Sequence, residues 1–317
     1  MTCAAPTPPI SCFALKISAA MPISRLSRST SMQLPEPNPI PAAPRPGSVR
    51  TLAVTGGKGG IGKTNVSVNL GVALAGLGKR TMLFDADLGL ANADVLLGLS
   101  PLHTLADLVA GRCGFPDVVI EGPAGLLIVP AASGRRHMAE LQPAEHTGLV
   151  NVFSEFEHDL DMLLVDTAAG ITDSVLTFCQ AAQDAAVVVC DEPASITDAY
   201  ALIKVLARER GVDRVQIIAN MVRSAHEGRA LYDKLSRVCE RFIGDVSLNY
   251  LGAVPHCEWL RAAVQRQQAV VQAFPGSPSA RALVEIAQRV GRWQSPAAPR
   301  GHVEFFVERM IRQGAPA

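Results

Sequence analysis

Residues 55–64 of this 317-residue chain read TGGKGGIGKT, directly after a short apolar run at 51–54. The stretch satisfies the pattern G-x-x-x-x-G-K-[ST], in which glycines let successive backbone N–H groups point at phosphate oxygens. Residues 65–77 have the length and composition of a helix, so the loop has the preceding strand and following helix that the pattern requires. The stretch therefore predicts a phosphate site at the amino end of a helix.

The residue types within this loop predict a site for a nucleotide's phosphates and Mg²⁺. The amine of Lys63 is expected to reach the β- and γ-phosphates, and the hydroxyl of Thr64 is expected to ligate Mg²⁺. The residues expected to surround the nucleotide phosphates are Gly57, Gly59, Gly60, Ile61, Gly62, Lys63, Thr64 and Asn65.

Short apolar runs recur along the rest of the chain and leave room for helices between them. Runs of four or five aliphatic residues without polar alternation are typical of strands buried on both faces. Helical segments alternate with them, as at 196–210, which a glycine follows. The alternation predicts an α/β fold: a single P-loop NTPase domain whose mostly parallel, twisted sheet has helices on both faces. The expected strands lie at 51–54, 81–84, 126–129, 162–165, 186–189, 215–219 and 250–254.

The distribution of proline divides the chain. Residues 1–48 contain 10 of the 22 prolines, a composition typical of a segment that cannot form a packed core. A second Pro-rich stretch begins at residue 295. We therefore expect a disordered extension over 1–48, an ATPase domain over 49–294, and a linker with a terminal amphipathic helix over 295–317.

Composition argues against several other classes of protein. The 29 basic and 29 acidic residues give zero net charge, and aromatic residues are 5% of the chain. Neither property favours nucleic-acid binding by bulk electrostatics or base stacking. The seven cysteines include no pair at CxxC spacing, so we expect free thiols in the cytoplasm, with Cys179 and Cys190 as packing residues. No apolar run reaches the roughly 18 residues that a membrane-spanning helix needs.

Acidic residues follow two of the expected strands. Asp85 and Asp87 follow the run at 81–84, and Asp166 follows the run at 162–165. The carboxyl ends of strands in an open α/β sheet face the ligand crevice, so we expect Asp166 to hold the Mg²⁺ shell. One of Asp85 and Asp87 is expected to lie near the metal and the other to lean toward the γ-phosphate. A turn-capping role is the alternative for Asp85.

Residues 58–64, KGGIGKT, resemble the deviant Walker A motif of the MinD/ParA family of ATPases. The resemblance implies that Lys58 crosses a dimer interface to the partner's nucleotide, so that hydrolysis requires two subunits. It also implies that Asp87 positions the attacking water and that Asp85 has a supporting role near the metal. Asn220 and Pro255 would contact the adenine, with turn capping as the alternative for Asn220.

The end of the chain carries a helical stripe. Its apolar residues fall at i, i+3, i+4, i+7 and i+8, as expected of one helix face. Such a helix could pack on the domain or lie in a membrane interface, and we favour the membrane. In MinD-like proteins, which the chain resembles, a terminal amphipathic helix is exposed in the ATP-bound dimer. The expected lipid-facing residues are Val303, Phe306, Val307, Met310 and Ile311.

Within this family the chain resembles the flagellar-number regulators of the FlhG/FleN group. The likeness covers about residues 50–312 and rests on residues 85–92, 166–171, 192–204 and 263–267. It implies an ATPase that limits the number of polar flagella. It also implies a signal-recognition-type GTPase, a flagellar transcription activator, or both, as partners.

We expect a Mg-ATP-driven homodimerising switch with slow hydrolysis, which is cytoplasmic and attaches peripherally to the inner membrane. Two alternatives are a ParA-type partition ATPase that binds DNA, and a nucleotide-bound scaffold that restrains a transcription activator without hydrolysis. The zero net charge argues against the first, so we do not expect DNA binding. The intact set of motif residues argues against the second.

Overall fold

The computed structural model describes residues 49–131, 136–156, 158–294, 300 and 302–308. The predicted extension over 1–48, most of the predicted linker, and Met310 and Ile311 of the predicted stripe lie outside the described residues.

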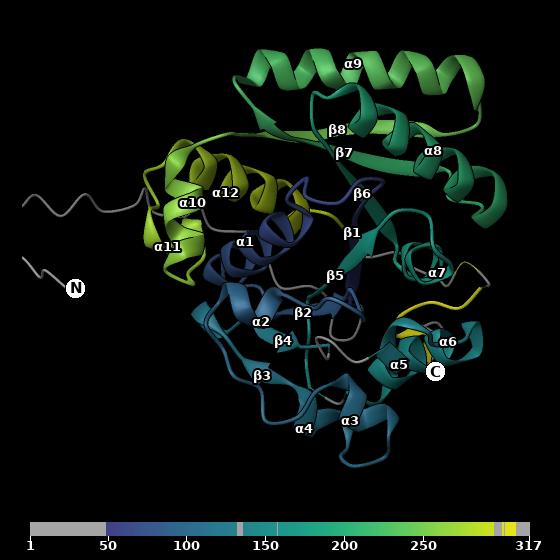
Figure 1. Ribbon diagram of the computed structural model, residues 1–317, viewed down its shortest axis with the longest axis vertical. Helices are drawn as coiled ribbons and strands as arrows, with labels where there is room; N and C mark the ends of the chain where they lie inside the picture. Colours follow the sequence, from purple (N-terminus) through teal and green to yellow (C-terminus); the bar gives the residue numbers. More distant parts are fainter. Residues whose placement is uncertain (1–48, 132–135, 157, 295–299, 301, 309–317) are drawn as a thin grey trace, which may run out of the picture. The chain divides into compact units, whose positions relative to one another are not determined.

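The described strands form one eight-stranded sheet in the order β3-β4-β2-β5-β1-β6-β7-β8 (Figure 1). The pairing is parallel except between β3 and β4, which confirms the predicted α/β sheet. Each expected run lies within or overlaps a strand, whereas β3 was not expected because two residues carry no periodicity. The strands are β1 (Arg50–Gly56), β2 (Thr81–Ala86), β3 (Ile120–Glu121), β4 (Leu127–Val129), β5 (Met162–Ala169), β6 (Asp184–Val189), β7 (Arg214–Val222) and β8 (Ser247–Pro255).

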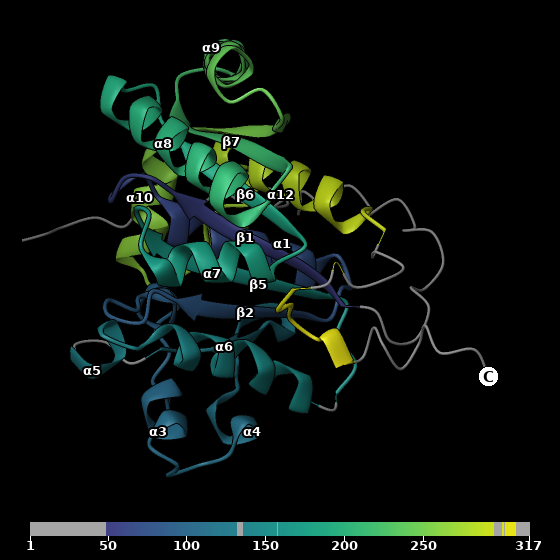
Figure 2. The same cartoon turned by 90° about the vertical axis from the view of Figure 1, so that its right-hand side faces the viewer.

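Helices cover both faces of the sheet (Figures 1 and 2). One core layer includes residues of α1, α10, α11 and α12, and the other includes residues of α6, α7, α8 and α9. The helices are α1 (Lys63–Gly76), α2 (Ala93–Leu96), α3 (Leu105–Val109), α4 (Phe115–Val118), α5 (Arg136–Ala139), α6 (Pro143–Val152), α7 (Asp173–Ala181), α8 (Pro193–Arg210), α9 (Ala225–Phe242), α10 (Glu258–Gln265), α11 (Val270–Ala273) and α12 (Pro278–Gly291).

The central strands are apolar on both sides because both core layers rest on them. In β1, Leu52 and Val54 belong to the core layer that includes α1, and Ala53 belongs to the opposite layer. All three side chains are fully buried. Since side chains alternate along a strand, burial of both faces explains why this run shows no polar alternation.

Helix α8 begins earlier than the sequence suggests. Its N-cap is Glu192, and Pro193 is its first residue, where the fixed φ of proline suits a helix start. Ser195, in the first turn of the helix, accepts a hydrogen bond on its hydroxyl from the N–H of Cys190 at 3.0 Å. The helix ends as expected at Gly211, whose φ of 67° is left-handed.

The two cysteines expected to be packing residues are buried, Cys179 at 1% exposure and Cys190 at 4%. Burial raises the pKa of the Cys179 thiol to about 12 and that of Cys190 to about 11. Both thiols are therefore protonated near neutral pH and act as small apolar groups.

The carboxyl-terminal segment that the structure describes enters the core. Phe305 and Phe306 are 0% and 1% exposed. The ring of Phe305 lies 5.2 Å from that of Phe153 and 6.3 Å from that of Phe84, measured between centroids. Phe306, which the sequence assigns to the membrane-facing stripe, is buried beside them, whereas Val303 of the same stripe is 40% exposed.

The prediction of one continuous helix from Val303 is therefore wrong over residues 302–306. Phe306 has a φ of 58°, in the left-handed region, and helical geometry begins only at Val307. A left-handed residue interrupts a right-handed helix. The backbone turns here because both aromatic rings are held in the core.

Candidate nucleotide-binding site

The phosphate loop joins β1 to α1, and close packing fixes its glycines. Gly62, the N-cap of α1, has a φ of 83°, and a Cβ there would lie 2.6 Å from Nδ2 of Asn220. At Gly57 a Cβ would lie 2.3 Å from the backbone oxygen of Asp198 in α8. Neither position has room for a side chain, so the loop can approach α8 and β7 only with glycine at both.

The two lysines of the loop have different surroundings. Lys63 is 8% exposed, and burial lowers its pKa whereas the charges of Asp166 and Asp87 raise it. The side chain of Lys58 is 37% exposed, and its Nζ donates to Oε2 of Glu192 at 2.5 Å. That hydrogen bond raises the pKa of Lys58. Lys63 thus belongs to the interior of the site, and Lys58 belongs to its surface.

Asp166 presents a buried carboxylate beside the start of α1. Ser67 donates its hydroxyl to Oδ1 of Asp166 at 2.8 Å, while Oδ2 is buried without a hydrogen-bond partner among the described residues. Burial raises the pKa of Asp166 to about 6, although hydrogen bonds from Ser67 and Thr64 lower it. An unpartnered carboxylate oxygen next to a threonine hydroxyl fits Mg²⁺, which prefers oxygen ligands.

Asp85 serves as a backbone cap. Its Oδ1 accepts from the N–H of Asp87 at 3.2 Å, and its Oδ2 accepts from Asn92 at 2.9 Å and Ala93 at 3.0 Å. This is the turn-capping alternative, and it shapes the loop that carries Asp87. The assignment of Asp85 to the metal stays a prediction.

Asp87 lies at the end of this capped turn. Its side chain is half-buried, and its Oδ1 accepts from the N–H of Leu90 at 3.2 Å. The Asp85 cap therefore fixes the backbone on which Asp87 stands. Its role toward the attacking water stays a prediction.

Asn220 bonds to the phosphate loop. Its Nδ2 donates to the backbone oxygen of Ile61 at 2.7 Å, and the residue is 2% exposed. This long-range bond braces the loop and is not the local turn cap given as the alternative for Asn220. Pro255 ends β8, opposite Val222 of β7. Adenine contacts of Asn220 and Pro255 stay predictions.

Two residues of the site were missed in the sequence. Ser67 lies one helical turn beyond Lys63 and Thr64 on α1, so its spacing could have placed it on the same face. Glu192 follows β6, and a carboxylate just beyond a strand was the signal already used for Asp166. Neither residue belongs to the loop motif itself.

The model for the CobQ/CobB/MinD/ParA nucleotide-binding domain matches residues 52–270. The chain belongs to this MinD/ParA family of nucleotide-binding proteins. The expected resemblance to the FlhG/FleN group is also confirmed. Over 267 residues the chain is 58% identical to the antiactivator FleN of Pseudomonas aeruginosa, covering 84% of this chain and 95% of that protein.

Two further relatives support the assignment. The flagellum site-determining protein YlxH of Helicobacter pylori is 32% identical, covering 84% of this chain and 91% of that protein. The solved structure of the septum site-determining protein MinD of Pyrococcus horikoshii, complexed with Mg-ADP, matches with a TM-score of 0.64 at 25% identity. That match covers 76% of this chain and 96% of that chain.

Proposed function

We propose that this chain is a Mg-ATP-dependent ATPase switch that hydrolyses ATP as a homodimer and regulates the number or placement of flagella. The surface position of Lys58 is the observation that supports dimer formation. Its amine pairs with Glu192 on the surface, whereas Lys63 is buried in the loop, where the nucleotide of the same subunit would bind. A second, exposed loop lysine is suited to contact the nucleotide of another subunit.

Exposed apolar side chains close to the same site also favour a second copy. Leu90, three residues beyond Asp87, is 69% exposed, and Ile171, directly after Gly170, is 51% exposed. Large apolar residues exposed together beside a ligand site are typical of an interaction surface. Contact with a second subunit would bury them when ATP is bound.

The proposed chemistry uses few groups. Thr64 and Asp166 would hold Mg²⁺, which neutralises charge on the phosphates. Lys63 would stabilise the charge that develops on the β- and γ-oxygens. Asp87 would orient the attacking water, and Lys58 of one subunit would complete the site of the other.

The dependence of the ATPase rate on protein concentration tests the role of Lys58. The rate per subunit of the unchanged protein is expected to rise with concentration. Lys58→Ala should abolish that rise and still bind ATP, and Lys234→Ala on the exposed face of α9 serves as the matched control. A Lys58→Ala protein whose rate still rises with concentration would contradict the proposal.

Light scattering on Asp87→Ala tests the role of Asp87. This variant should retain ATP and accumulate as a dimer in Mg-ATP, because dimerisation no longer leads to hydrolysis. The same variant should be monomeric in Mg-ADP. A variant that stays monomeric in Mg-ATP would show that Asp87 does not have this role.

We further propose peripheral attachment of this chain to the inner membrane from the cytoplasm. No helix of the described part of the chain is long and apolar enough to cross a bilayer. Because Phe305 and Phe306 are core residues, the lipid contact is assigned to residues from Val307 onward. Removing residues 307–317 should abolish binding to vesicles while ATP binding persists; unchanged vesicle binding would refute this assignment.

The name of the FleN relative favours a second candidate for part of this function. An antiactivator could restrain a flagellar transcription activator in its ATP-bound form without turnover. An interaction with a signal-recognition-type GTPase is proposed on the same family grounds. If the Asp87→Ala variant restrains an activator as well as the unchanged protein does, then ATP binding is sufficient for the restraint and ATP hydrolysis is not required.

A further inference from the structure

A pocket lies at the end of the sheet opposite the phosphate loop. The loop follows the carboxyl end of β1, whereas the pocket is formed around the amino ends of β1, β7 and β8. Its volume is about 350 Å³. Its lining residues are Arg50, Gln183, Asp213, Arg214, Ser247 and Arg300.

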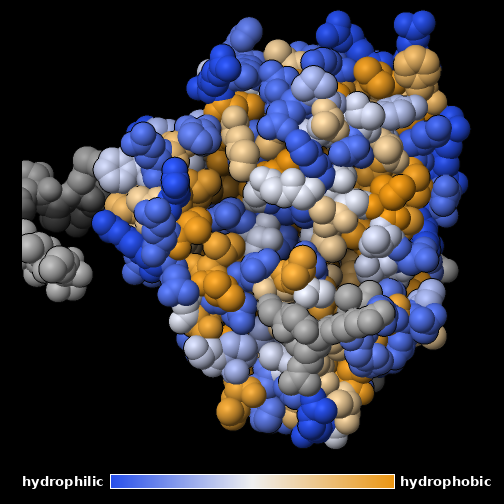
Figure 3. Space-filling view, viewed as in Figure 1, coloured by the Kyte–Doolittle hydropathy of each residue, from blue (hydrophilic) through white to orange (hydrophobic). Residues whose placement is uncertain are grey.

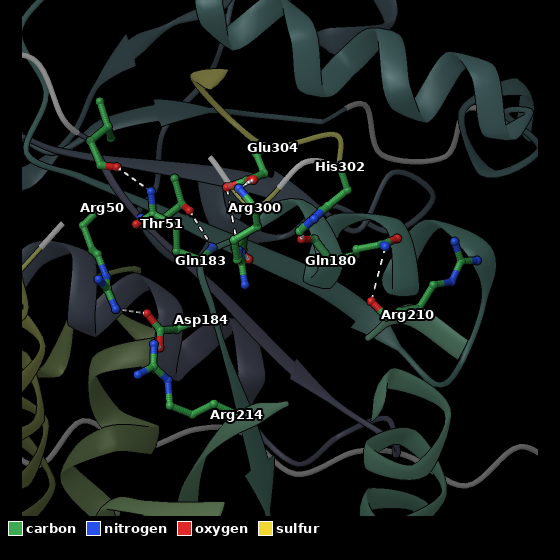
Figure 4. A network of polar contacts seen from close by, with 12 residues as sticks. Arg50, Thr51, Gln180, Gln183, Asp184, Arg210, Arg214, Arg300, His302 and Glu304 are labelled. Carbon is green, nitrogen blue, oxygen red and sulfur yellow. Dashed lines mark hydrogen bonds and ion pairs between the residues drawn. The ribbon is translucent and has the colours of Figure 1, made fainter. Parts of the chain in front are cut away.

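Three arginines from distant parts of the chain meet here (Figure 4). Arg50 and Arg214 share the carboxylate of Asp184, with Nη2 of Arg214 at 3.3 Å from Oδ1. Arg300 donates from Nη2 to the backbone oxygen of Ala182 at 2.5 Å. Its Nε lies 3.8 Å from Oε2 of Glu304.

The pocket has more hydrogen-bond donors than acceptors. Three guanidinium groups carry about fifteen N–H bonds, and their protein acceptors are Asp184, Glu304 and two backbone oxygens, among the residues described. Arg50 is only 9% exposed, and its Nε has no hydrogen-bond partner within the described chain. A buried donor without an acceptor is costly, so an added acceptor would stabilise the site.

The carboxylates around the pocket do not supply enough acceptors for these arginine N–H groups. Asp184 and Glu304 are 3% and 1% exposed, and both already face arginines. Asp213 lies on the exposed strand end. Burial lowers the pKa of Arg50, and the charges of Arg214 and Arg300 lower it further, although Asp184 raises it. Arg214 and Arg300 therefore each lie close enough to Arg50 for their charges to oppose its protonation.

We propose that this pocket binds a phosphate-type oxyanion through Arg214 and Arg300, with Arg50 behind them. Guanidinium groups match the geometry of phosphate oxygens and form charge-assisted hydrogen bonds with them. The oxyanion could be a soluble phosphate or the phosphodiester of a lipid headgroup. Arg300 lies seven residues before Val307 in the sequence, so the proposed lipid-binding tail follows this pocket closely along the chain. Only this lipid source rests on the proposed membrane attachment.

Trp293 provides a local probe, because its ring lies 5.4 Å from Cζ of Arg50. The chain has two tryptophans, and Trp259→Phe leaves Trp293 as the single fluorophore. The protein is kept saturated with Mg-ADP so that the phosphate loop is filled. It is then titrated with inorganic phosphate, with phosphatidylcholine vesicles, and with vesicles that also contain phosphatidylglycerol.

We expect a saturable change in Trp293 fluorescence that is weakened about tenfold by Arg214→Gln. Arg300→Gln provides a second variant, and thermal unfolding checks that each is folded. Arg281→Gln, an exposed arginine of α12 outside the pocket, should respond like the unchanged protein. The half-exposed side chain of Arg214 makes it the safer first substitution.

A response to inorganic phosphate identifies a soluble oxyanion. A response only to vesicles with phosphatidylglycerol, lost in Arg214→Gln, identifies the lipid headgroup. A protein that lacks residues 307–317 should still respond to inorganic phosphate even if the membrane proposal fails. The proposal that the pocket binds an oxyanion would be refuted by the absence of a response to either ligand. Equal responses of the Arg214→Gln variant and the protein with Arg214 would also refute it.

Discussion

Asp85 and Asp166 lie opposite each other on the adjacent parallel strands β2 and β5, and both are 1% exposed. Burial, together with the charge of Asp166, raises the pKa of Asp85 to about 7. Burial raises the pKa of Asp166 to about 6. Two buried like charges are unfavourable unless a cation lies near them. The arrangement therefore suits a bound metal ion, and it lowers the stability of the folded protein when no metal is bound.

This pair predicts how the stability of the metal-free protein depends on pH. Both folded-state pKa values exceed the ordinary value of 3.8, so the folded state binds more protons over that interval. The free energy of unfolding should therefore fall as pH rises from about 4 to about 7. Thermal unfolding in a chelator measures it. Asp166→Asn should flatten this fall and unfold at a higher temperature at pH 8, and an unchanged slope would contradict the assignment.

Ser67→Ala should weaken metal-dependent ATP binding. Its hydroxyl donates to Oδ1 of Asp166 at 2.8 Å, and loss of a hydrogen bond to a charged group costs about 1.5–3 kcal/mol. We expect the Mg²⁺ concentration at half-maximal ATPase rate to rise about tenfold, in line with other losses around metal ligands. Ser236→Ala on α9 is the control. Equal Mg²⁺ dependence in both variants would remove Ser67 from the site.

Asn220→Ala separates two roles of that residue. If its amide chiefly braces the loop through Ile61, the variant should lose affinity for ATP, GTP and inorganic tripolyphosphate by a similar factor. We expect this result, with a loss of about tenfold for the broken buried hydrogen bond. Competition binding with the three ligands measures it. A loss confined to ATP would instead assign Asn220 to the adenine.

Phe305→Ala should destabilise the docked end of the chain. Loss of a buried phenylalanine side chain typically costs about 3–5 kcal/mol. Because a terminal segment can detach from the domain, the loss cannot exceed the free energy by which this segment packs on it. We expect a loss of about 2–4 kcal/mol in the free energy of unfolding, measured with denaturant. Phe242→Ala, whose side chain is 55% exposed, should change it by less than about 0.5 kcal/mol. Similar losses in both would show that the Phe305 contacts contribute little.

The local pattern of the sequence was sufficient for seven of the eight described strands and for the phosphate loop. The run at 51–54 lies in β1, and the loop motif leads into α1 at Lys63. Apolar periodicity and glycine spacing reflect short-range geometry, namely strand burial, helix starts and left-handed φ values. Such features are encoded within about ten residues and can be read without the fold.

The positions of polar groups relative to one another depended on tertiary structure. Asn220 and Ile61 are separated by 159 positions in sequence and Lys58 and Glu192 by 134. The family resemblance implied that Asn220 contacts the adenine, whereas the packing of β7 against the loop gives its amide a backbone partner. A side chain's hydrogen bonds depend on which strand ends become neighbours, and the local sequence does not contain that information.

The end of the chain gives the clearest division between the two sources. The sequence by itself determined that residues 303–311 alternate apolar and polar positions with helical spacing. Only the tertiary structure decided that Phe305 and Phe306 face Phe153 in the core and that the helix starts after them. An amphipathic pattern records that one face avoids water, but core and bilayer both satisfy it. The space available beside Phe153 selects the core for these two rings. Apolar side chains elsewhere, as on the face shown in Figure 3, reach the surface.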